Sequence, residues 1–395
     1  MIESRDGRRV VITGVGVVAP CGIGAEDFWQ GLAKPAEPQV ERRVEGFDPF
    51  AIGLSKVEVR RLDPFAQFAL TAADEALRDA GLAEPQPDAD RCGVFIGSGI
   101  GGATSWESSV LTLRDKGPRG VSPLIVPMVM PNAAAGAVSM RWGLRGPCET
   151  IATACATGTQ SIGNAARLIA AGRADMMIAG GAEAALSGVS LSGFGNMRAL
   201  SPSGVSRPFD PERDGFCAAE GAGLLVLEEA GRAAARGARV YAEVAGTGST
   251  ADAHHLTAPA PGGAGAIACM RLALADAGLD PAEVTHVNAH GTSTALNDAA
   301  EAEAIVAVFG PNRPAVTSIK GVTGHSLGGA GGIEAVALAL TYTHRTIPPT
   351  MGTMTVDPAL DIDVVLSPQA WEPAPAISNS FGFGGHNGTL AFRPA

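Results

Sequence analysis

The sequence is poor in aromatic residues, poor in charged residues and without long apolar runs. Aromatic side chains make up 5% of its 395 residues and charged ones 17%. Because glycine (52 residues) and alanine are abundant instead, we expect helices packed closely on strands in a layered α/β protein. No uninterrupted apolar stretch reaches roughly 18 residues, so we expect no helix that spans a membrane.

Positive charge is also scarce, and the cysteines form no recognisable pattern. The net charge of −11 and a pI near 5.1 argue against nucleic acid as a partner, although a local basic patch remains open. The six cysteines, at positions 21, 92, 148, 155, 217 and 269, contain no Cys-x-x-Cys pair and no metal spacing. We expect reduced thiols, five of them packing residues, as in cytoplasmic proteins. The polar N-terminus, residues 1–9, lacks the apolar run of a signal peptide.

An internal repeat is visible half a chain apart. Residues 76–82 recur at 273–279, with six of seven positions identical and an offset of 197. Each copy ends a helical stretch, and its glycine, Gly81 or Gly278, stands where a helix terminates with a left-handed residue. Strands are predicted at corresponding places before and after the two copies: 10–14, 93–97, 241–246 and 284–288. The pattern indicates a duplicated α/β unit.

The duplication suggests one compact body with two cores. We place the halves at residues 1–235 and 236–395, which meet in an Ala/Arg-rich helix at 228–238. Because strands and helices alternate, we expect mainly buried strands with helices outside them.

Cys155 is the candidate nucleophile. It lies among small residues in the window 152–158 and directly precedes a helical stretch at 158–171. A cysteine at a helix N-terminus is near free N–H groups and the positive end of the helix dipole, which favour the thiolate. Such a thiolate can attack a thioester and hold the acyl group covalently. The alternative is a buried, inert cysteine.

Two further windows each contain a histidine among small residues. His290, in the window 288–294, follows a strand, where α/β proteins place ligand chemistry; the alternative is a core histidine. His325 lies in a glycine-rich turn that enters a helix running to about residue 341, and Lys320 precedes it. The spacing differs from that of a phosphate-binding loop. One cysteine, two hydrogen-bond-donating histidines and a lysine fit carbon–carbon bond formation on thioesters better than hydrolysis.

The C-terminal window 379–387 alternates glycine with aromatic residues. It predicts a tight turn that brings a backbone N–H group, that of Phe383, to a reacting centre. A bulged edge strand with two core aromatics is the alternative.

Taken together, the windows resemble those of the elongating β-ketoacyl-[acyl carrier protein] synthases, the condensing enzymes of type II fatty-acid and polyketide synthesis. The resemblance covers essentially the whole chain and includes further motifs at 11–14, 97–99, 145–147, 179–183, 207–210, 213–216 and 220–223. It implies the thiolase fold, with two duplicated βαβαβ halves in five α/β/α/β/α layers. It also implies a dimer whose acyl pocket the neighbouring subunit completes, either a homodimer or a heterodimer with a chain-length factor.

The resemblance implies a decarboxylative condensation. Cys155 would accept an acyl chain from an acyl carrier protein, and the enolate formed from malonyl-carrier protein would attack it. His290 and His325 would donate to the thioester oxygen as it gains charge, and the N–H groups of Cys155 and Phe383 would form the other oxyanion hole. Lys320, with Glu301 and Asp298, would set the polarity around His325, or these charges would form a plain structural ion pair.

Other residues are expected to contact the substrate or the carrier. The phosphopantetheine arm, delivered by the carrier protein, would lie against Thr292 and Thr294, and neither a metal nor a bound cofactor is needed. By resemblance, the acyl tunnel passes the gating Phe383 and is lined by Ile100, Ile125, Val126, Ala185, Ser190 and Phe194. The carrier would dock on Lys56, Arg60, Arg61, Arg119 and Arg198, unless these are ordinary solvated charges.

Some alternatives remain open. A noncatalytic chain-length or decarboxylating subunit would lack Cys155, and a thiolase acting on coenzyme A esters would carry a second reactive cysteine. The chain departs from the family at His386, where many fatty-acid members have threonine, and at Ile125 and residues 103–110, near the expected tunnel. The resemblance therefore implies neither a chain length nor a choice between fatty-acid and polyketide pathways.

Overall fold

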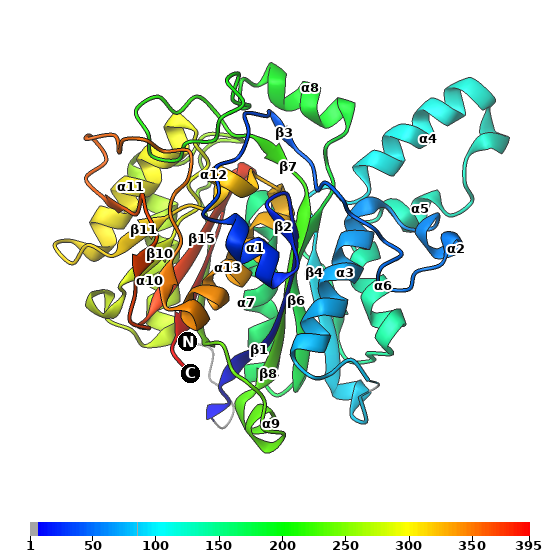
Figure 1. The fold of residues 1–395 in the computed structure, drawn as a ribbon, viewed down its shortest axis with the longest axis horizontal. Coiled ribbons are helices and arrows are strands. Elements are labelled where there is room, and N and C mark those ends of the chain that lie inside the picture. The colour runs from blue at the N-terminus through cyan, green and yellow to red at the C-terminus, as the bar shows by residue number, and fades with distance from the viewer. Residues whose placement is uncertain (1–6, 85) are drawn as a thin grey trace.

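The computed structural model describes residues 7–84 and 86–395, and one mixed sheet of twelve strands runs through it (Figure 1). The N-terminal half contributes β1 (Val10–Ala19), β4 (Cys92–Gly97), β5 (Cys148–Glu149), β6 (Met176–Glu183) and β8 (Gly221–Glu229), with β2 (Gly22–Ile23) at its side. The C-terminal half contributes β9 (Glu243–Ala251), β10 (His286–Asn288), β11 (Ala315–Thr317), β13 (Asp363–Val364), β15 (Ala376–Gly382) and β16 (His386–Arg393).

Strand pairing is the same in both halves. In the N-terminal half, β4 pairs in parallel with β5 and β6, and β8 pairs antiparallel with β6 and β1. In the C-terminal half, β10 pairs in parallel with β11 and β15, and β16 pairs antiparallel with β15 and β9. The halves join where Val11 of β1 pairs with Glu243 of β9. Identical order and direction confirm the predicted duplication.

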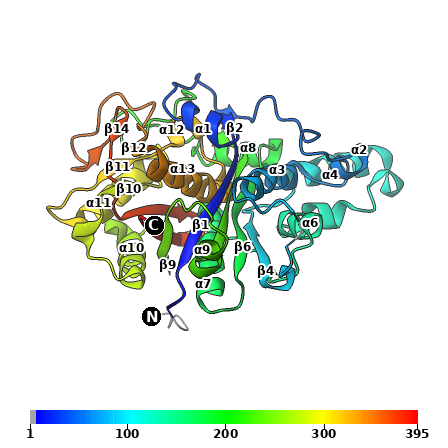
Figure 2. The same ribbon diagram turned by 60° about the horizontal axis from the view of Figure 1, so that its bottom comes forward.

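Helices form three layers around the two half-sheets (Figure 2). The α3 helix (Pro64–Asp79) covers the outer face of the N-terminal half, and α10 (Ala264–Ala277) covers that of the C-terminal half. Between the half-sheets lie α7 (Thr157–Ala170) and α13 (Ala330–His344), which contact strands of both. The predicted five-layer α/β/α/β/α arrangement is therefore confirmed.

The central helices lie between the two half-sheets, as the five-layer arrangement requires, rather than outside the strands. Every residue of α13 from Ala330 to Tyr342 is buried. The two central helices approach closely because they cross at glycines: a Cβ on Gly158 would lie 2.5 Å from the backbone nitrogen of Gly332. A larger residue at this crossing would separate the layers that hold the two halves together.

The other elements complete the outer surfaces. They are α1 (Ala25–Gly31), α2 (Lys56–Val59), α4 (Ala103–Lys116), α5 (Ile125–Val129), α6 (Ala133–Trp142), α8 (Gly188–Asn196), α9 (Ala230–Ala235), α11 (Ala295–Phe309), α12 (Lys320–Thr323), β3 (Glu41–Arg42), β7 (Ala218–Ala219), β12 (Thr346–Ile347) and β14 (Gln369–Ala370). The α4–α5 region stands out from the body, with α2 nearby (Figure 1). Within the described residues, no helix combines the length and the hydropathy needed to cross a membrane.

Most predicted boundaries agree with the structure. Gly81 (φ 70°) and Gly278 (φ 61°) take the left-handed conformation expected after α3 and α10. The helix expected at 228–238 is wrong at its start, because β8 continues to Glu229 and α9 begins at Ala230. The prediction for the N-terminus falls mostly on residues 1–6, which lie outside the described residues.

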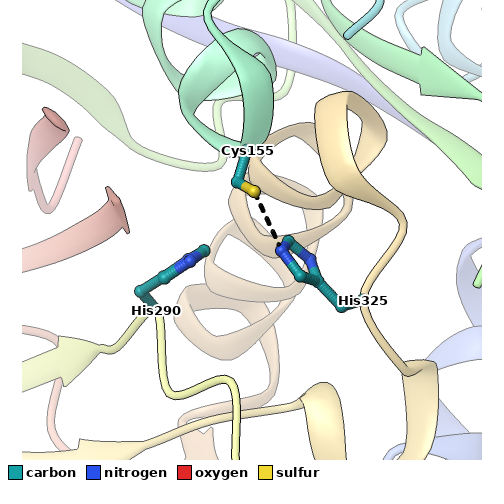
Figure 3. Close-up of side chains that lie close together, drawn as sticks. All are labelled: Cys155, His290 and His325. Carbon is teal, nitrogen blue, oxygen red and sulfur yellow. Dashed lines mark hydrogen bonds between the residues drawn. The ribbon is translucent and has the colours of Figure 1, made fainter. Parts of the chain in front are cut away.

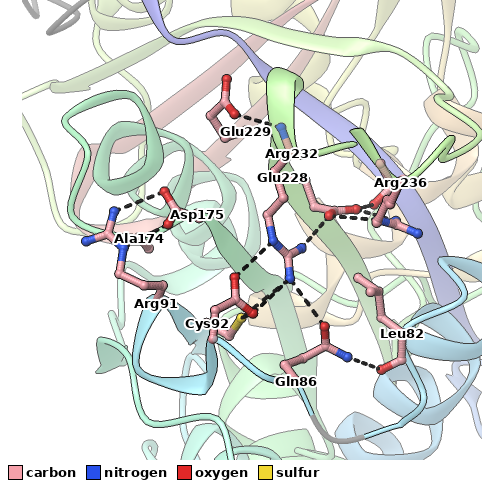
Figure 4. Close-up of polar contacts among 12 residues, drawn as sticks. Leu82, Gln86, Arg91, Cys92, Ala174, Asp175, Glu228, Glu229, Arg232 and Arg236 are labelled. Carbon is pink, nitrogen blue, oxygen red and sulfur yellow. Dashed lines mark hydrogen bonds and ion pairs between the residues drawn. The ribbon is translucent and has the colours of Figure 1, made fainter. Parts of the chain in front are cut away.

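The buried carboxylate of Glu228 explains why β8 extends through this residue. The Glu228 side chain is fully buried and pairs with both Arg232 and Arg236 (Figure 4). Arg232 also lies 3.2 Å from Asp88. These contacts attach α9 to the N-terminal half. The division between residues 235 and 236 stays a prediction.

Candidate active site

Cys155, His290 and His325 come together in the interior (Figure 3). The Sγ atom of Cys155 lies 3.1 Å from Nε2 of His325. The rings of His290 and His325 meet edge to face, with centroids 5.3 Å apart. All three side chains are at most 4% exposed. The three windows of the sequence thus form one site.

Cys155 lies in a tight turn before a helix. The 3₁₀ turn Ala154–Ala156 leads directly into α7. Ala154 has a φ of 49°, a left-handed conformation that a residue with a Cβ adopts at a cost. Across the turn, the N–H of Thr153 donates to the hydroxyl of Thr157 at 2.8 Å. The turn directs the thiol toward His325 rather than into the packing of α7.

Backbone pairing holds His325 in place. Its N–H donates to the carbonyl of Cys217 at 2.8 Å, and its own carbonyl accepts from the N–H of Ala219 at 3.0 Å. The buried Arg42, on β3 beside β7, donates to the carbonyl of Gly321 at 2.7 Å. Segments from both halves therefore fix the turn that carries His325.

His290 follows β10 and is held by two charged groups. Glu301 on α11 accepts from the N–H groups of His290 and Gly291, each at 2.8 Å. The ammonium of Lys320 donates to the His290 carbonyl at 2.6 Å and lies 3.3 Å from its Nδ1. Lys320 also forms an ion pair with Glu334 on α13, and both side chains are almost completely buried.

The structure adds a carboxylate to the expected grouping of Lys320, Glu301 and Asp298 around His325, and that grouping stays a prediction. Lys320 contacts His290, and its carboxylate partner is Glu334. Asp298 accepts from the N–H of Phe209 at 2.8 Å. Sequence reasoning missed Glu334, although a lone acidic residue in the otherwise apolar helix α13 was a usable signal.

The lysine fixes the proton of His290. The ammonium of Lys320 can only donate hydrogen bonds. Nδ1 of His290 therefore accepts from Lys320, and Nε2 carries the ring proton. Among the described residues, Nδ1 of His325 has no hydrogen-bond partner. Its tautomer is therefore free to change, while that of His290 is not.

Burial sets the charge states of the site. It lowers the pKa of both His290 and His325 well below the usual value, and the charge of Lys320 lowers both further. Burial raises the pKa of the Cys155 thiol to about 11, although the Phe383 amide and Lys320 oppose the shift. The expected thiolate is thus not the state favoured here, because desolvation of the buried sulfur outweighs the helix terminus. The resting site is a thiol beside neutral imidazoles.

A pocket of about 380 Å³ opens onto the three side chains. Of the residues expected to contact substrate or carrier, its lining includes Phe383, Thr292, Thr294 and Arg198, and Glu301 also lines it. Phe383 lies in the tight connection between β15 and β16. These strands occupy the middle of the sheet, so the edge-strand alternative for residues 379–387 is wrong.

The residues expected along the acyl tunnel lie outside this pocket and do not form one group. Ala185 and Phe194 pack beside Cys155, and the Phe194 ring lies 6.5 Å from that of Phe383. Ser190 lies in the first turn of α8, where Ser187 caps its N–H. The remaining three, Ile100, Ile125 and Val126, are half-buried or exposed within the single chain.

The basic residues expected to dock a carrier are all exposed. Among the described residues, none of the five has a carboxylate partner within 4.0 Å. Arg60 and Arg61 follow α2, whereas Arg198 borders the pocket. The five are therefore free cations, although only Arg198 is at the pocket itself.

Sequence reasoning gave no role to Glu183, although it belongs to the motif at 179–183, and it missed the loop around Thr257. Glu183 is buried at the end of β6 and accepts from Ser98, from the amides of Gly99 and Ile100, and from Gly328. Burial raises its pKa to about 7. Besides that motif, its sequence signal was an acidic residue at the end of an apolar strand. Thr257 lines the pocket from a loop that no motif distinguished.

Comparisons with known proteins agree with this geometry. The family model described as "Beta-ketoacyl synthase, N-terminal domain" matches residues 33–233, and its C-terminal counterpart matches residues 241–354. Two curated proteins named 3-oxoacyl-[acyl-carrier-protein] synthase 2, from Staphylococcus aureus (strain COL) and Synechocystis sp. (strain ATCC 27184 / PCC 6803 / Kazusa), are each 44% identical, with 98% of both chains covered.

Solved structures of ketosynthases also match this chain over nearly its whole length. The complex AntDE:AntF, a type II PKS acyl-carrier protein with its ketosynthase, contains a chain that matches with a TM-score of 0.89 and 33% identity, covering 98% of this chain and 99% of that one. A β-ketoacyl synthase from Burkholderia phymatum STM815 matches with a TM-score of 0.89 and 34% identity, covering 98% and 100%. With the Cys-His-His site and the duplicated fold, these matches show that the chain belongs to the β-ketoacyl synthase family.

Proposed function

We propose that the chain catalyses the decarboxylative condensation of an acyl group with malonyl-acyl carrier protein, in fatty-acid or type II polyketide chain elongation. The product would be a 3-oxoacyl thioester on the carrier. The supporting observation is the contact of 3.1 Å between Sγ of Cys155 and Nε2 of His325, with a second histidine beside it in the pocket.

The first step would be acyl transfer to Cys155. The neutral Nε2 of His325 would take the thiol proton as the sulfur attacks the thioester carbonyl. The carbon–sulfur bond to pantetheine then breaks, and the proton passes to the leaving sulfur. Since nothing among the described residues binds Nδ1 of His325, this ring can accept at Nε2 and later donate from it.

The second step would be loss of CO₂ from the malonyl group. His290, whose Nε2 keeps its proton because Lys320 donates to Nδ1, would donate to the thioester oxygen as the enolate forms. His325 would donate beside it. Preorganised donors of this kind typically contribute ~3–4 kcal/mol each. The enolate carbon would then attack the acyl carbon on Cys155, whose oxygen would bind the amides of Cys155 and Phe383. The bond from that carbon to Sγ then breaks, which releases the 3-oxoacyl thioester, and the sulfur takes up a proton from solvent to restore the thiol.

The carrier protein would bring its substrate on a phosphopantetheine arm, and no metal or cofactor held by the chain is required. We assign the arm to Thr292 and Thr294, whose hydroxyls lie 2.9 Å apart in the pocket lining. We assign docking to Lys56, Arg60, Arg61, Arg119 and Arg198, because free cations suit an acidic carrier. Reduced thiols fit a cytoplasmic location.

We further propose a dimer, with a second copy or with a chain-length factor. Exposed apolar residues gather on α4 and around α5: Trp106, Val110, Leu111, Leu113, Leu124, Val126 and Met130. An apolar surface of this kind is typical of an interface. Ile125 and Val126 would then line the acyl tunnel of the neighbouring subunit.

The central test follows acylation and decarboxylation separately. After incubation with an acyl thioester, mass spectrometry should find the acyl group on Cys155, and Cys155→Ala should abolish it. His290→Ala should slow decarboxylation of malonyl-carrier protein by roughly 10²-fold or more while self-acylation survives. Cys148→Ala, which changes an exposed thiol, should behave like the parent.

The rival functions give different results. A noncatalytic partner subunit would not acylate Cys155, and a thiolase would accept acetyl-coenzyme A without releasing CO₂ from malonyl-carrier protein. Decarboxylation at the parent rate after loss of both histidines would contradict the enolate-stabilising role.

A further inference from the structure

Glu183 is a fully buried carboxylate beside the site, and neither proposed step of the reaction uses it. Among the described residues, no arginine or lysine lies within 4.0 Å of its oxygens. A buried charge without a counter-ion is costly unless several donors bind it. Its four donors are the hydroxyl of Ser98 and the N–H groups of Gly99, Ile100 and Gly328. Because hydrogen bonds to a charged group are strong, Glu183 fixes the segments that supply these donors.

The carboxylate joins two loops that are far apart in the sequence. Its Oε2 accepts from the N–H of Gly99 at 2.7 Å and from that of Gly328 at 3.1 Å. Gly99 follows β4, and Gly328 lies three residues after His325. The two backbones are so close that a Cβ on Gly328 would lie 2.4 Å from the nitrogen of Gly99. Glu183, Gly99 and Gly328 thus form a clip between the loop after β4 and the turn that carries His325.

The turn after His325 needs this support. Leu327 has a φ of 46°, a left-handed conformation that a residue with a Cβ keeps only where its surroundings hold it. The Leu327 side chain belongs to the same small apolar cluster as Cys155. The backbone before Leu327 is fixed by the pairing of His325 beside β7. The bond from Gly328 to Glu183 fixes the backbone after it, so the clip completes the hold on this turn.

His290 is supported separately. Glu301 accepts from its N–H, and Lys320 binds its carbonyl and its Nδ1. Within the described part of the chain, the hydrogen bonds of Glu183 involve neither of these residues. A change at Glu183 should therefore displace one histidine and leave the other in place.

We propose that Glu183 is a positioning residue that acts through His325. Its carboxylate holds the turn after His325 against the loop after β4, which keeps Nε2 at 3.1 Å from the thiol of Cys155. This role rests on the proposed function, in which His325 is the base of acyl transfer. A misplacement of about 1 Å can cost 10²-fold in rate, so loosening the clip should slow acylation although Glu183 touches no reacting atom.

Two variants open the clip from opposite sides. Glu183→Gln puts an amide NH₂ against a backbone N–H in either orientation, because each carboxylate oxygen accepts from at least one such group. Gly99→Ala keeps the carboxylate but places a Cβ 2.7 Å from its Oε2. Both variants should slow acylation of Cys155 by roughly 10-fold or more. Gly136→Ala, whose Cβ would meet nothing within 4 Å, is the matched control and should acylate at the parent rate.

A double-mutant cycle separates positioning from general damage to the fold. Mass spectrometry of the full-length protein follows acylation of Cys155 by a small acyl thioester at pH 8, above the pKa of about 7 to which burial raises Glu183. Residues that act as a unit are not additive. In a His325→Ala background, Glu183→Gln should therefore slow acylation no further. In a His290→Ala background, it should slow acylation by its full factor.

Urea unfolding reports the stability of each variant, and Gly99→Ala takes the place of Glu183→Gln in the cycle if the latter does not fold. An equal loss of acylation rate in the parent and His325→Ala backgrounds would overturn the proposal. Acylation at the parent rate by both clip variants would overturn it as well. Acylation at the parent rate by His325→Ala alone would instead contradict the base assigned in the proposed function, and the role of Glu183 would fall with it.

Discussion

Lys320→Met tests whether the buried lysine acts on His290 or only stabilises the fold. The Lys320 and Glu334 side chains are 1% and 2% exposed. Removing one partner leaves the other buried without a counter-charge, which typically costs about 3–5 kcal/mol of unfolding free energy. The substitution also removes the donor that fixes the proton of His290 on Nε2.

A double variant separates these two effects. Lys320→Met with Glu334→Gln removes both charges at similar volume, and such replacements of buried pairs are often close to neutral. We expect urea unfolding to recover most of the lost stability. Decarboxylation of malonyl-carrier protein should remain roughly 10²-fold below the parent rate, as for a lost oxyanion donor.

The assays are urea unfolding, CO₂ release and acylation of Cys155, with the exposed Lys34→Met as a control. If the double variant decarboxylates at the parent rate, the tautomer argument is refuted and Lys320 has a structural role only. A loss below about 1 kcal/mol for Lys320→Met alone would instead refute the reasoning from the buried pair.

Three further predictions concern other parts of the molecule. Burial lowers the pKa of His286 to about 3, so the unfolded chain takes up its proton first below pH 6.5, and stability should fall by about 2 kcal/mol between pH 6.5 and pH 5. Urea unfolding of His286→Phe should lack this part of the pH dependence; an unchanged slope would contradict it. Ile125→Trp should block long acyl donors and spare short ones in an intact dimer, whereas loss of all donor lengths together with the dimer would indicate interface packing alone. Arg60→Glu with Arg61→Glu should raise the KM for carrier-bound substrates but not for small thioesters, and equal losses for both would indicate misfolding.

Local patterns in the sequence were sufficient for much of the fold. The repeat at 76–82 and 273–279 predicted the duplication, and the glycines at 81 and 278 ended the helices as expected. These features depend on residues that are close together in the sequence, so they can be predicted without knowing which distant segments they contact. The strand boundary at Glu228 could not be predicted this way, because its position depends on distant arginines and on burial.

The reactive residue types were likewise readable from the sequence. Cys155, His290 and His325 were each distinguished by windows of small residues, and the structure brings them within contact although 170 positions separate Cys155 from His325. The sequence therefore identified which side chains could react. It did not identify their charge states.

Only the tertiary structure decided those states. It paired Lys320 with Glu334 rather than Glu301, attached the ammonium to Nδ1 of His290, and buried Cys155 so completely that its thiol keeps its proton. It also left Ile125 half-buried on α5, outside the pocket of its own chain. Such properties depend on which distant segments exclude water from a group and which charges face it. Residue identity and spacing along the chain specify neither the exclusion of water nor the neighbouring charges.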